Sequence, residues 1–178
     1  FSLGYHALTD TASRVRCYEA VLGQLKYFDH DRRSAVATEI GRRGAITEHK
    51  PLMMTRAQLK KLRVAGAEIG AHTHTHPILE LMEDGKAYAE IEAGKLELES
   101  ILGESVNVFA YPNGVPSRDC SARHGEMVRS LGFVAAVSTE PKFASTRSDV
   151  FHLPRFTPWD RTPNRFAARC LMQLWRKP

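Results

Sequence analysis

The 178-residue sequence predicts an α/β fold with parallel strands, arranged in a layer or in a barrel. From residue 55 onward, apolar runs typical of strands alternate with longer amphipathic patterns typical of helices. The composition, 43% hydrophobic and 25% charged, is that of an ordinary globular domain. Two unusual polar segments directly follow predicted strands, where the chemistry of such folds collects.

The first fifty residues are predicted to be helical. Apolar residues recur there at steps of three and four, namely Val15, Tyr18, Leu22 and Leu25. A second, arginine-rich helix is expected over residues 32–41, with Asp29 or Asp31 as its N-cap. Residues 44–52 show no clear period, so we expect a connection there.

A regular repeat begins at Thr55. Thr55 followed by Gln58 is a capping-box pattern, which predicts the start of a helix that ends near Gly66. A short strand is predicted over residues 67–71. The later elements alternate in the same way: a helix over 84–102 that ends at Gly103, a strand over 106–110, a helix over 120–131, strands over 133–138 and 151–156, and a last helix that begins after Thr162.

Charge is unevenly distributed along the chain, whose net charge is +5. Residues 78–104 hold eight acidic and two basic residues, and residues 142–178 hold eight basic and two acidic ones. The basic block has helical spacing beside Phe166, Cys170 and Leu174, so we interpret it as the solvated face of an amphipathic helix. We therefore expect no nucleic-acid partner. No apolar run approaches the roughly 18 residues of a membrane span, so none is expected.

The three cysteines, Cys17, Cys120 and Cys170, are odd in number, far apart and without a CxxC pair. This pattern argues against a disulfide framework and against a thiolate zinc site. Reduced or buried thiols are expected.

Three histidines, His72, His74 and His76, lie within five residues after the strand predicted over 67–71. Imidazole suits zinc and similar ions, and His72 and His76 have the i,i+4 spacing that lets two rings converge if the turn is helical. His74 would then point elsewhere. A histidine cluster in a loop without any ligand is the alternative, and the position at a strand end favours the metal. The metalloprotease motif HExxH is excluded, because Thr73 replaces its glutamate.

Tyr111-Pro112-Asn113-Gly114 follows the strand predicted over 106–110. Pro-Asn-Gly is good turn chemistry, and the spacing by itself favours a simple turn. Opposite a metal, however, the backbone N–H groups of such a turn can form an oxyanion hole.

Together, these segments resemble the polysaccharide deacetylases, the NodB-homology domains of carbohydrate esterase family four. The family's second motif, H-[ST]-x-x-H, is matched by His72, Thr73 and His76, and the resemblance runs from about residue 52 to 166. It implies a partial (β/α) barrel of the polysaccharide deacetylase type that lacks the first strands. The whole chain, 1–178, would be a single incomplete domain, with residues 1–51 as a helical insertion region and residues 52–178 as the strand–helix repeats.

The resemblance also implies a function, the metal-dependent hydrolysis of N-acetyl groups on amino-sugar polymers or glycoconjugates. His72 and His76 would bind a divalent metal, with zinc the expected ion, and Tyr111, Pro112 and Asn113 would bind the N-acetylated glycan substrate. Acetate and a free amine on the sugar would be the products. The expected source is a bacterium, in its cell envelope or cytoplasm.

The family's first motif, TFDDG, supplies an aspartate ligand and an aspartate base, but this sequence contains no Asp-Asp pair. We reject Asp29 and Asp31 as substitutes, because a helical pattern precedes them and no glycine follows. The expectation is a C-terminal piece that is inactive alone, whose catalytic base and acid are unknown. Its partner would be the missing N-terminal part of the same domain.

Two further residues depart from the family pattern. Ala110 and Asn113 stand where many relatives have arginine and tyrosine. Some branches of the family share this form, so the change does not by itself imply inactivity. The absent aspartates support a competing hypothesis, a non-catalytic glycan-binding or interaction module of the same fold.

Overall fold

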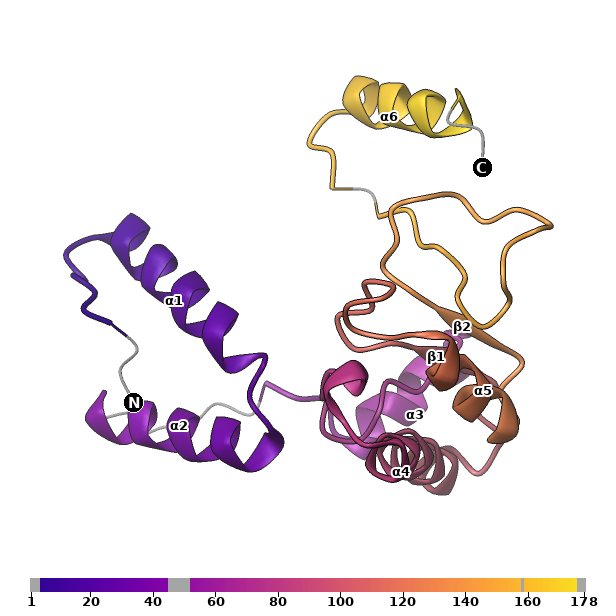
Figure 1. The fold of residues 1–178 in the computed structure, drawn as a ribbon, viewed down its shortest axis with the longest axis horizontal. Helices are drawn as coiled ribbons and strands as arrows, with labels where there is room; N and C mark the ends of the chain where they lie inside the picture. Colours follow the sequence, from indigo (N-terminus) through magenta and orange to yellow (C-terminus); the bar gives the residue numbers. More distant parts are fainter. Residues whose placement is uncertain (1–3, 45–51, 158, 176–178) are drawn as a thin grey trace. The chain divides into compact units, whose positions relative to one another are not determined.

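The structure, a computed structural model, describes residues 4–44, 52–157 and 159–175 (Figure 1). The chain divides into two compact units, Phe1–Met54 and Thr55–Pro178. This division lies close to the predicted boundary between residues 51 and 52. That both units belong to one incomplete domain stays a prediction.

The first unit contains two helices, α1 (Thr11–Leu25) and α2 (His30–Arg43). The Asp29 side chain caps α2 by accepting a hydrogen bond from the Arg32 N–H at 2.9 Å, as predicted for one of the two aspartates. In the stripe expected to be the apolar face of α1, Leu25 is buried, whereas Tyr18 is 64% exposed. Most of the predicted connection over 44–52 lies outside the described residues.

The second unit contains the other helices, which are α3 (Arg56–Val64), α4 (Asp84–Leu102), α5 (Ala122–Ser130) and α6 (Pro163–Trp175), with a 3₁₀ turn at Leu79–Leu81. The predicted capping box at the start of α3 is present. Thr55 accepts from the Gln58 N–H at 3.3 Å, and the Gln58 side chain accepts from the Thr55 N–H at 2.8 Å. The helix predicted over 84–102 is confirmed, and Gly103 ends it with a left-handed φ of 74°.

The sheet consists of two parallel strands, β1 (Val108–Ala110) and β2 (Ala135–Val137). One isolated parallel bridge extends it on either side, from Ala71 to β1 and from Leu153 to β2. The strands predicted over 67–71 and 151–156 are therefore present only as single bridging residues, Ala71 and Leu153. Past Leu153 the register is lost, because Arg155 donates its N–H to the Glu140 carbonyl oxygen at 3.0 Å.

The expected barrel is not present among the described residues. What the structure shows instead is a mixed helix–sheet unit in which the extended segments lie in chain order, with Ala71 first, then β1, β2 and Leu153. The helices α4 and α5 occupy the connections between the first three of these segments, as in consecutive βαβ units.

The core of this unit lies between α4, α5 and the sheet. The helix α4 contacts both α3 and α5, and α5 contacts β2 (Figure 1). The fully buried apolar side chains come from both helices, from β1 and from the connections, and include Leu79, Ile91, Val106, Phe109 and Val128. The chemistry-bearing segments therefore extend from a rigid, packed base.

The three cysteines are free thiols, and Cys120 is buried, as expected from the sequence. Burial, together with the nearby carboxylates of Asp119 and Glu80, raises the pKa of the Cys120 thiol to about 12. This thiol therefore stays protonated at neutral pH and behaves as a small apolar core residue.

Glu99 joins the last turn of α4 to the segment that enters β1. Its carboxylate accepts hydrogen bonds from the Lys95 ammonium and, at 3.0 Å, from the Val106 N–H. The Lys95 ammonium also donates to the Val106 carbonyl oxygen at 2.9 Å. The hydrogen bonds from Lys95 and Val106 lower the pKa of Glu99 below its ordinary value.

This lowered pKa predicts a pH-dependent contribution to stability. The ionised Glu99 stabilises the fold above its unfolded pKa of roughly 4.3, and the contribution is lost as the pH falls through the lower, folded pKa. We expect Glu99→Gln to lower the free energy of unfolding at pH 6 and to have a much smaller effect near pH 3. Urea denaturation of both proteins at the two pH values measures this. Glu92→Gln is the control, and an effect of Glu99→Gln that is equal at both pH values would contradict the assignment.

Candidate functional site

The two predicted functional segments leave the sheet at the same edge. Ala71 pairs with β1 through the Ala71 N–H to Val108 O bond and the Ala110 N–H to Ala71 O bond, each 2.9 Å. The histidine segment begins at the next residue, His72, and the turn Tyr111–Gly114 begins directly after Ala110. Because the pairing is parallel, both segments emerge in the same direction, as the sequence predicted.

The histidine segment is a loop and not a helical turn, which was the condition under which the i,i+4 spacing lets the two rings converge. Thr73 and His76 adopt left-handed conformations, with φ values of 60° and 59°. Such values are uncommon for residues other than glycine and mark positions at which the surroundings impose the backbone conformation. The rings of His72 and His76 nevertheless converge, with centroids 4.8 Å apart and planes at 72°. The i,i+4 spacing thus brings the rings together by a different backbone route.

The orientation of His72 is set by β1. Its Nδ1 lies 2.6 Å from the Ala110 carbonyl oxygen. A carbonyl can only accept, so Nδ1 carries the proton and the neutral ring keeps its lone pair on Nε2. This is the arrangement by which proteins orient histidine ligands of metals.

His74 is directed to a different partner. Its Nε2 lies 3.3 Å from a carboxylate oxygen of Glu97 on α4. The structure therefore brings the rings of His72 and His76 together and directs His74 to Glu97, and the binding of a metal by the pair stays a prediction.

A third metal ligand does not join the pair within the described residues. No group of three or more histidine, cysteine, aspartate or glutamate side chains there is placed to hold a metal ion. Asp29, one of the two aspartates rejected from the sequence, is engaged as the N-cap of α2 in the other unit. The pair offers two imidazole donors, one fewer than a typical catalytic zinc site.

Tyr111 and Pro112 are buried, so the turn presents mainly Asn113 to an incoming ligand. The Tyr111 side chain is 1% exposed, and its hydroxyl donates to the Phe151 carbonyl oxygen at 2.8 Å. Burial, followed by the nearby Cys120 and Asp149, raises the pKa of the Tyr111 hydroxyl well above its usual value. The tyrosine predicted to bind substrate therefore contributes packing at this edge, and its side chain is closed to substrate.

The backbone of the turn leaves one N–H group available. Tyr111 donates to Val137 O at 3.2 Å, Pro112 has no N–H, and Gly114 donates to Pro112 O at 2.6 Å. Within the described part of the chain, the Asn113 N–H has no acceptor. Asn113 is itself left-handed, with a φ of 57°, and Thr139 holds its carbonyl oxygen through a hydroxyl bond of 2.7 Å. An N–H fixed in this way fits one half of an oxyanion hole.

His152, to which the sequence analysis gave no role, packs against the first residue of the turn, Tyr111. Its ring stacks on Tyr111 with centroids 5.1 Å apart and planes at 11°. Its nitrogens face Asp149 Oδ2 at 3.2 Å and the Ser121 carbonyl oxygen at 3.1 Å. Hydrogen bonds from the Phe151 N–H and then from His152 lower the pKa of Asp149. Only the three-dimensional structure shows this contact, because no spacing links residues 111 and 152.

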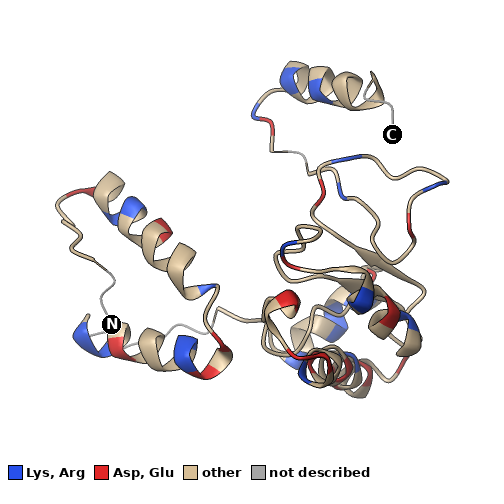
Figure 2. Cartoon of the chain, viewed as in Figure 1, with Lys and Arg blue, Asp and Glu red and all other residues tan. Residues whose placement is uncertain are grey.

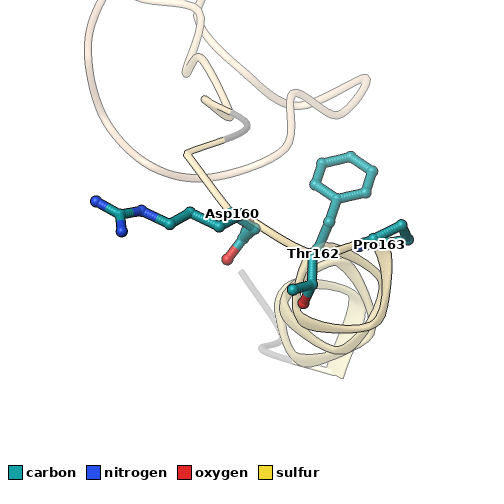
Figure 3. A pocket seen from close by; sticks show the side chains of 5 residues that line it. Asp160, Thr162 and Pro163 are labelled. Carbon is teal, nitrogen blue, oxygen red and sulfur yellow. The ribbon is translucent and has the colours of Figure 1, made fainter.

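The last helix carries a pocket of its own. A shallow hollow of about 350 Å³ at the start of α6 is lined by Asp160, Arg161, Thr162, Pro163 and Phe166 (Figure 3). It is formed by neighbouring residues of one segment and includes neither of the functional segments. We assign it no function.

The helix α6 carries arginines, which are blue in Figure 2, and one of them forms contacts within the structure. Arg169 pairs with Asp160 at 2.5 Å and donates to the Thr157 carbonyl oxygen at 2.6 Å. Arg169 is therefore partly buried, whereas Leu174, which was expected on the apolar face, is 68% exposed, so the interpretation of the basic block as a solvated face stays a prediction. No helix in the described ranges has the length and apolar character needed to cross a membrane.

Comparison with known proteins identifies relatives of this chain. A family model described as "Polysaccharide deacetylase" matches residues 17–136. No curated protein matches the chain.

Several solved structures share its fold. The Streptococcus pyogenes deacetylase PplD, in complex with acetate, is 23% identical with a TM-score of 0.57, over 70% of this chain and 51% of that chain. A polysaccharide deacetylase from Bacillus cereus is 21% identical with a TM-score of 0.55, over 65% of this chain and 36% of that chain. IcaB from Ammonifex degensii is 20% identical with a TM-score of 0.51, over 68% of this chain and 54% of that chain. This chain thus spans about half or less of these structures.

The contact between His72 and Ala110 predicts the tautomer of the ring. We expect the neutral His72 to carry its proton on Nδ1, because that nitrogen donates to a carbonyl. Nitrogen-15 NMR of the histidine rings distinguishes the two tautomers directly. A proton found on Nε2 would contradict the geometry described for this site.

Proposed function

The chain belongs to the polysaccharide deacetylase family, and on that premise we propose that it supplies two metal ligands and an oxyanion donor for the deacetylation of an N-acetylated glycan. The family itself suggests a hydrolase that acts on amides. One observation carries the proposal for this chain, namely the convergence of the His72 and His76 rings at 4.8 Å beside the Asn113 turn.

The two histidines fit a divalent ion, and zinc is the ion that we propose. His72 has its Nδ1 engaged and its Nε2 lone pair directed elsewhere, which is the state that a metal requires. When bound, such an ion polarises the amide carbonyl and lowers the pKa of a water molecule at the site. The proposed contribution of His72 and His76 is to hold that ion at the edge of the sheet.

The Asn113 N–H has a separate task in this proposal. As water adds to the carbonyl carbon of the N-acetyl group, negative charge develops on the carbonyl oxygen, and a fixed N–H stabilises it. The C–N bond then breaks, the acetyl carbon keeps the oxygen from water, and the sugar nitrogen takes a proton. The products are acetate and a free amine on an amino-sugar polymer or glycoconjugate.

The third ligand and the general base are proposed to come from a further part of the same domain. The 178 residues contain no Asp-Asp pair, and the described residues provide no third donor at the site. Ala71 uses both of its backbone groups to pair with β1, so a preceding strand would have to pair through the neighbouring residues Gly70 and His72, which face the opposite edge in an extended segment. The chain-order pairing from Ala71 to Leu153 supports a section of a (β/α) barrel wall.

A second candidate function is a module that binds glycan without hydrolysing it. The observation that favours it is the same two-donor site, which lacks a carboxylate ligand among the described residues. The two functions are distinguished by whether an aspartate motif joined to this chain restores turnover.

The first prediction concerns the chain as given. We expect weak zinc binding and no acetate release, because the pair is one ligand short and a positioned proton-transfer group is typically worth about 10²–10⁴-fold in rate. Calorimetric titration with zinc and an acetate assay measure the two properties. Tight one-to-one binding that Asp29→Ala or Asp31→Ala abolishes, together with acetate release, would overturn the proposed division of the site.

The second prediction concerns a longer protein that contains this chain and the aspartate motif. It should release acetate from N-acetylated oligosaccharides, and a chelator should stop the reaction. His72→Ala and His76→Ala should each lower the rate by more than about 100-fold, since even groups that only orient metal ligands are typically worth 10–100-fold. His74→Ala is the matched control and should change the rate little. Unchanged rates in the His72 and His76 variants would exclude the proposed site.

A further inference from the structure

Glu90 on α4 accepts several hydrogen bonds from the histidine loop. Its Oε2 accepts hydrogen bonds from the Thr75 N–H at 2.8 Å and from the His74 N–H at 3.1 Å. Its Oε1 accepts from the Thr75 hydroxyl at 2.9 Å. The backbone carbonyl of Glu90 also lies 3.1 Å from the His74 N. One helical residue thus engages the two residues between the left-handed positions of the loop.

The loop needs such support, because its backbone conformation is unfavourable by itself. Thr73 and His76 are both left-handed, and conformations of this kind persist only where the surroundings over-determine them. Within the loop, the Thr73 hydroxyl donates to His72 O at 2.6 Å and accepts from the His76 N–H at 3.1 Å. These bonds move with the loop, whereas the bonds to Glu90 tie it to a packed helix.

A glycine in α4 allows the helix to lie close to the loop. Gly94 lies one turn beyond Glu90, on the same face of α4. A Cβ at this position would lie 2.6 Å from both the backbone carbon and the oxygen of Thr73, so only glycine fits without a shift of the loop. Glu97, on the same face, holds the His74 ring at 3.3 Å.

We propose that Glu90 is a positioning residue for the metal-binding histidines, an inference that rests on the proposed function. By fixing His74 and Thr75 against α4, its carboxylate holds the loop in the conformation in which His72 and His76 converge. Glu90 does not act as a ligand, because both of its oxygens are engaged by the loop. The partner that this arrangement serves is a divalent cation at the ends of the two rings.

A first experiment tests, in the absence of metal, whether the Glu90 carboxylate holds the histidine loop in place. Amide hydrogen exchange reports the N–H groups of His74 and Thr75, and ring-to-ring NMR contacts report the approach of His72 and His76. Glu90→Ala should remove the protection of the Thr75 amide and the ring contact, whereas the His74 amide keeps the backbone carbonyl of residue 90 as an acceptor and should lose only part of its protection. Glu90→Gln should retain them, because the amide oxygen can accept from the N–H groups and its NH₂ can donate to the Thr75 hydroxyl.

Glu92→Ala is the matched control. Glu92 lies on the same helix and is half-buried, and its side chain forms no hydrogen bond or ion pair among the described residues. It should leave the loop unchanged. A second variant, Gly94→Ala, keeps the carboxylate but displaces Thr73, and it should also separate the two rings.

A second experiment adds zinc and follows the ring resonances. Glu90→Ala should weaken zinc binding by about 10-fold or more, as is typical for groups that orient metal ligands, and Glu90→Gln should stay within a few-fold of the wild type. If zinc leaves the wild-type ring resonances unchanged, the proposed function fails. The hydrogen-exchange data would then still show whether Glu90 holds the loop. Retained protection of the Thr75 amide, together with a retained ring contact, in Glu90→Ala would overturn the proposal. An equal loss of protection in β1 and β2 would do so too, since it would show general unfolding.

Discussion

The pairing of Ala71 with β1 is the contact on which the candidate site depends. It consists of two backbone hydrogen bonds of 2.9 Å, and it places the residue before the histidine loop beside the residue before the Asn113 turn. Because Ala110 is held at this position, its carbonyl oxygen can accept a hydrogen bond from the His72 Nδ1–H. A single bridge therefore determines both where the two functional segments meet and which ring nitrogen faces outward.

The helix α4 connects this edge of the sheet to the stability of the unit. One face of the helix buries Ala87 and Ile91 in the core, and the neighbouring face presents Glu90, Gly94 and Glu97 to the histidine loop. At its C-terminal end, Glu99 and Lys95 hold the segment that leads into β1. The helix thus positions the loop from one side while the strand positions it from the other, which is how a loop with two left-handed residues is kept in place.

The site combines residues that could be recognised from the sequence with residues that could not. His72 and His76 stand in a short motif whose spacing already indicates a shared ligand. The support from Glu90 and the stacking of His152 on Tyr111 bring together residues 15 to 41 positions apart, and no periodicity links them. The burial of Tyr111 was likewise invisible, because a tyrosine after a strand occurs both at surfaces and in cores. The family relationship assigns the chain to the polysaccharide deacetylase family, whereas the local contacts show which groups of the two segments already have partners.

By itself, the sequence determined the features that depend on neighbouring residues. The capping box of Thr55 and Gln58, the helix from 84 to 102 with Gly103 at its end, and the Asp29 cap all involve contacts within a few positions, so the pattern was sufficient to predict them. The tertiary structure alone decided how far the strands extend and how the histidine loop is folded. A strand exists only where a partner continues its ladder, and the segments around Ala71 and Leu153 meet such a partner at one residue each. The loop is not helical for a similar reason, since its conformation is imposed by Glu90, Gly94 and Ala110, which lie on other elements of the fold.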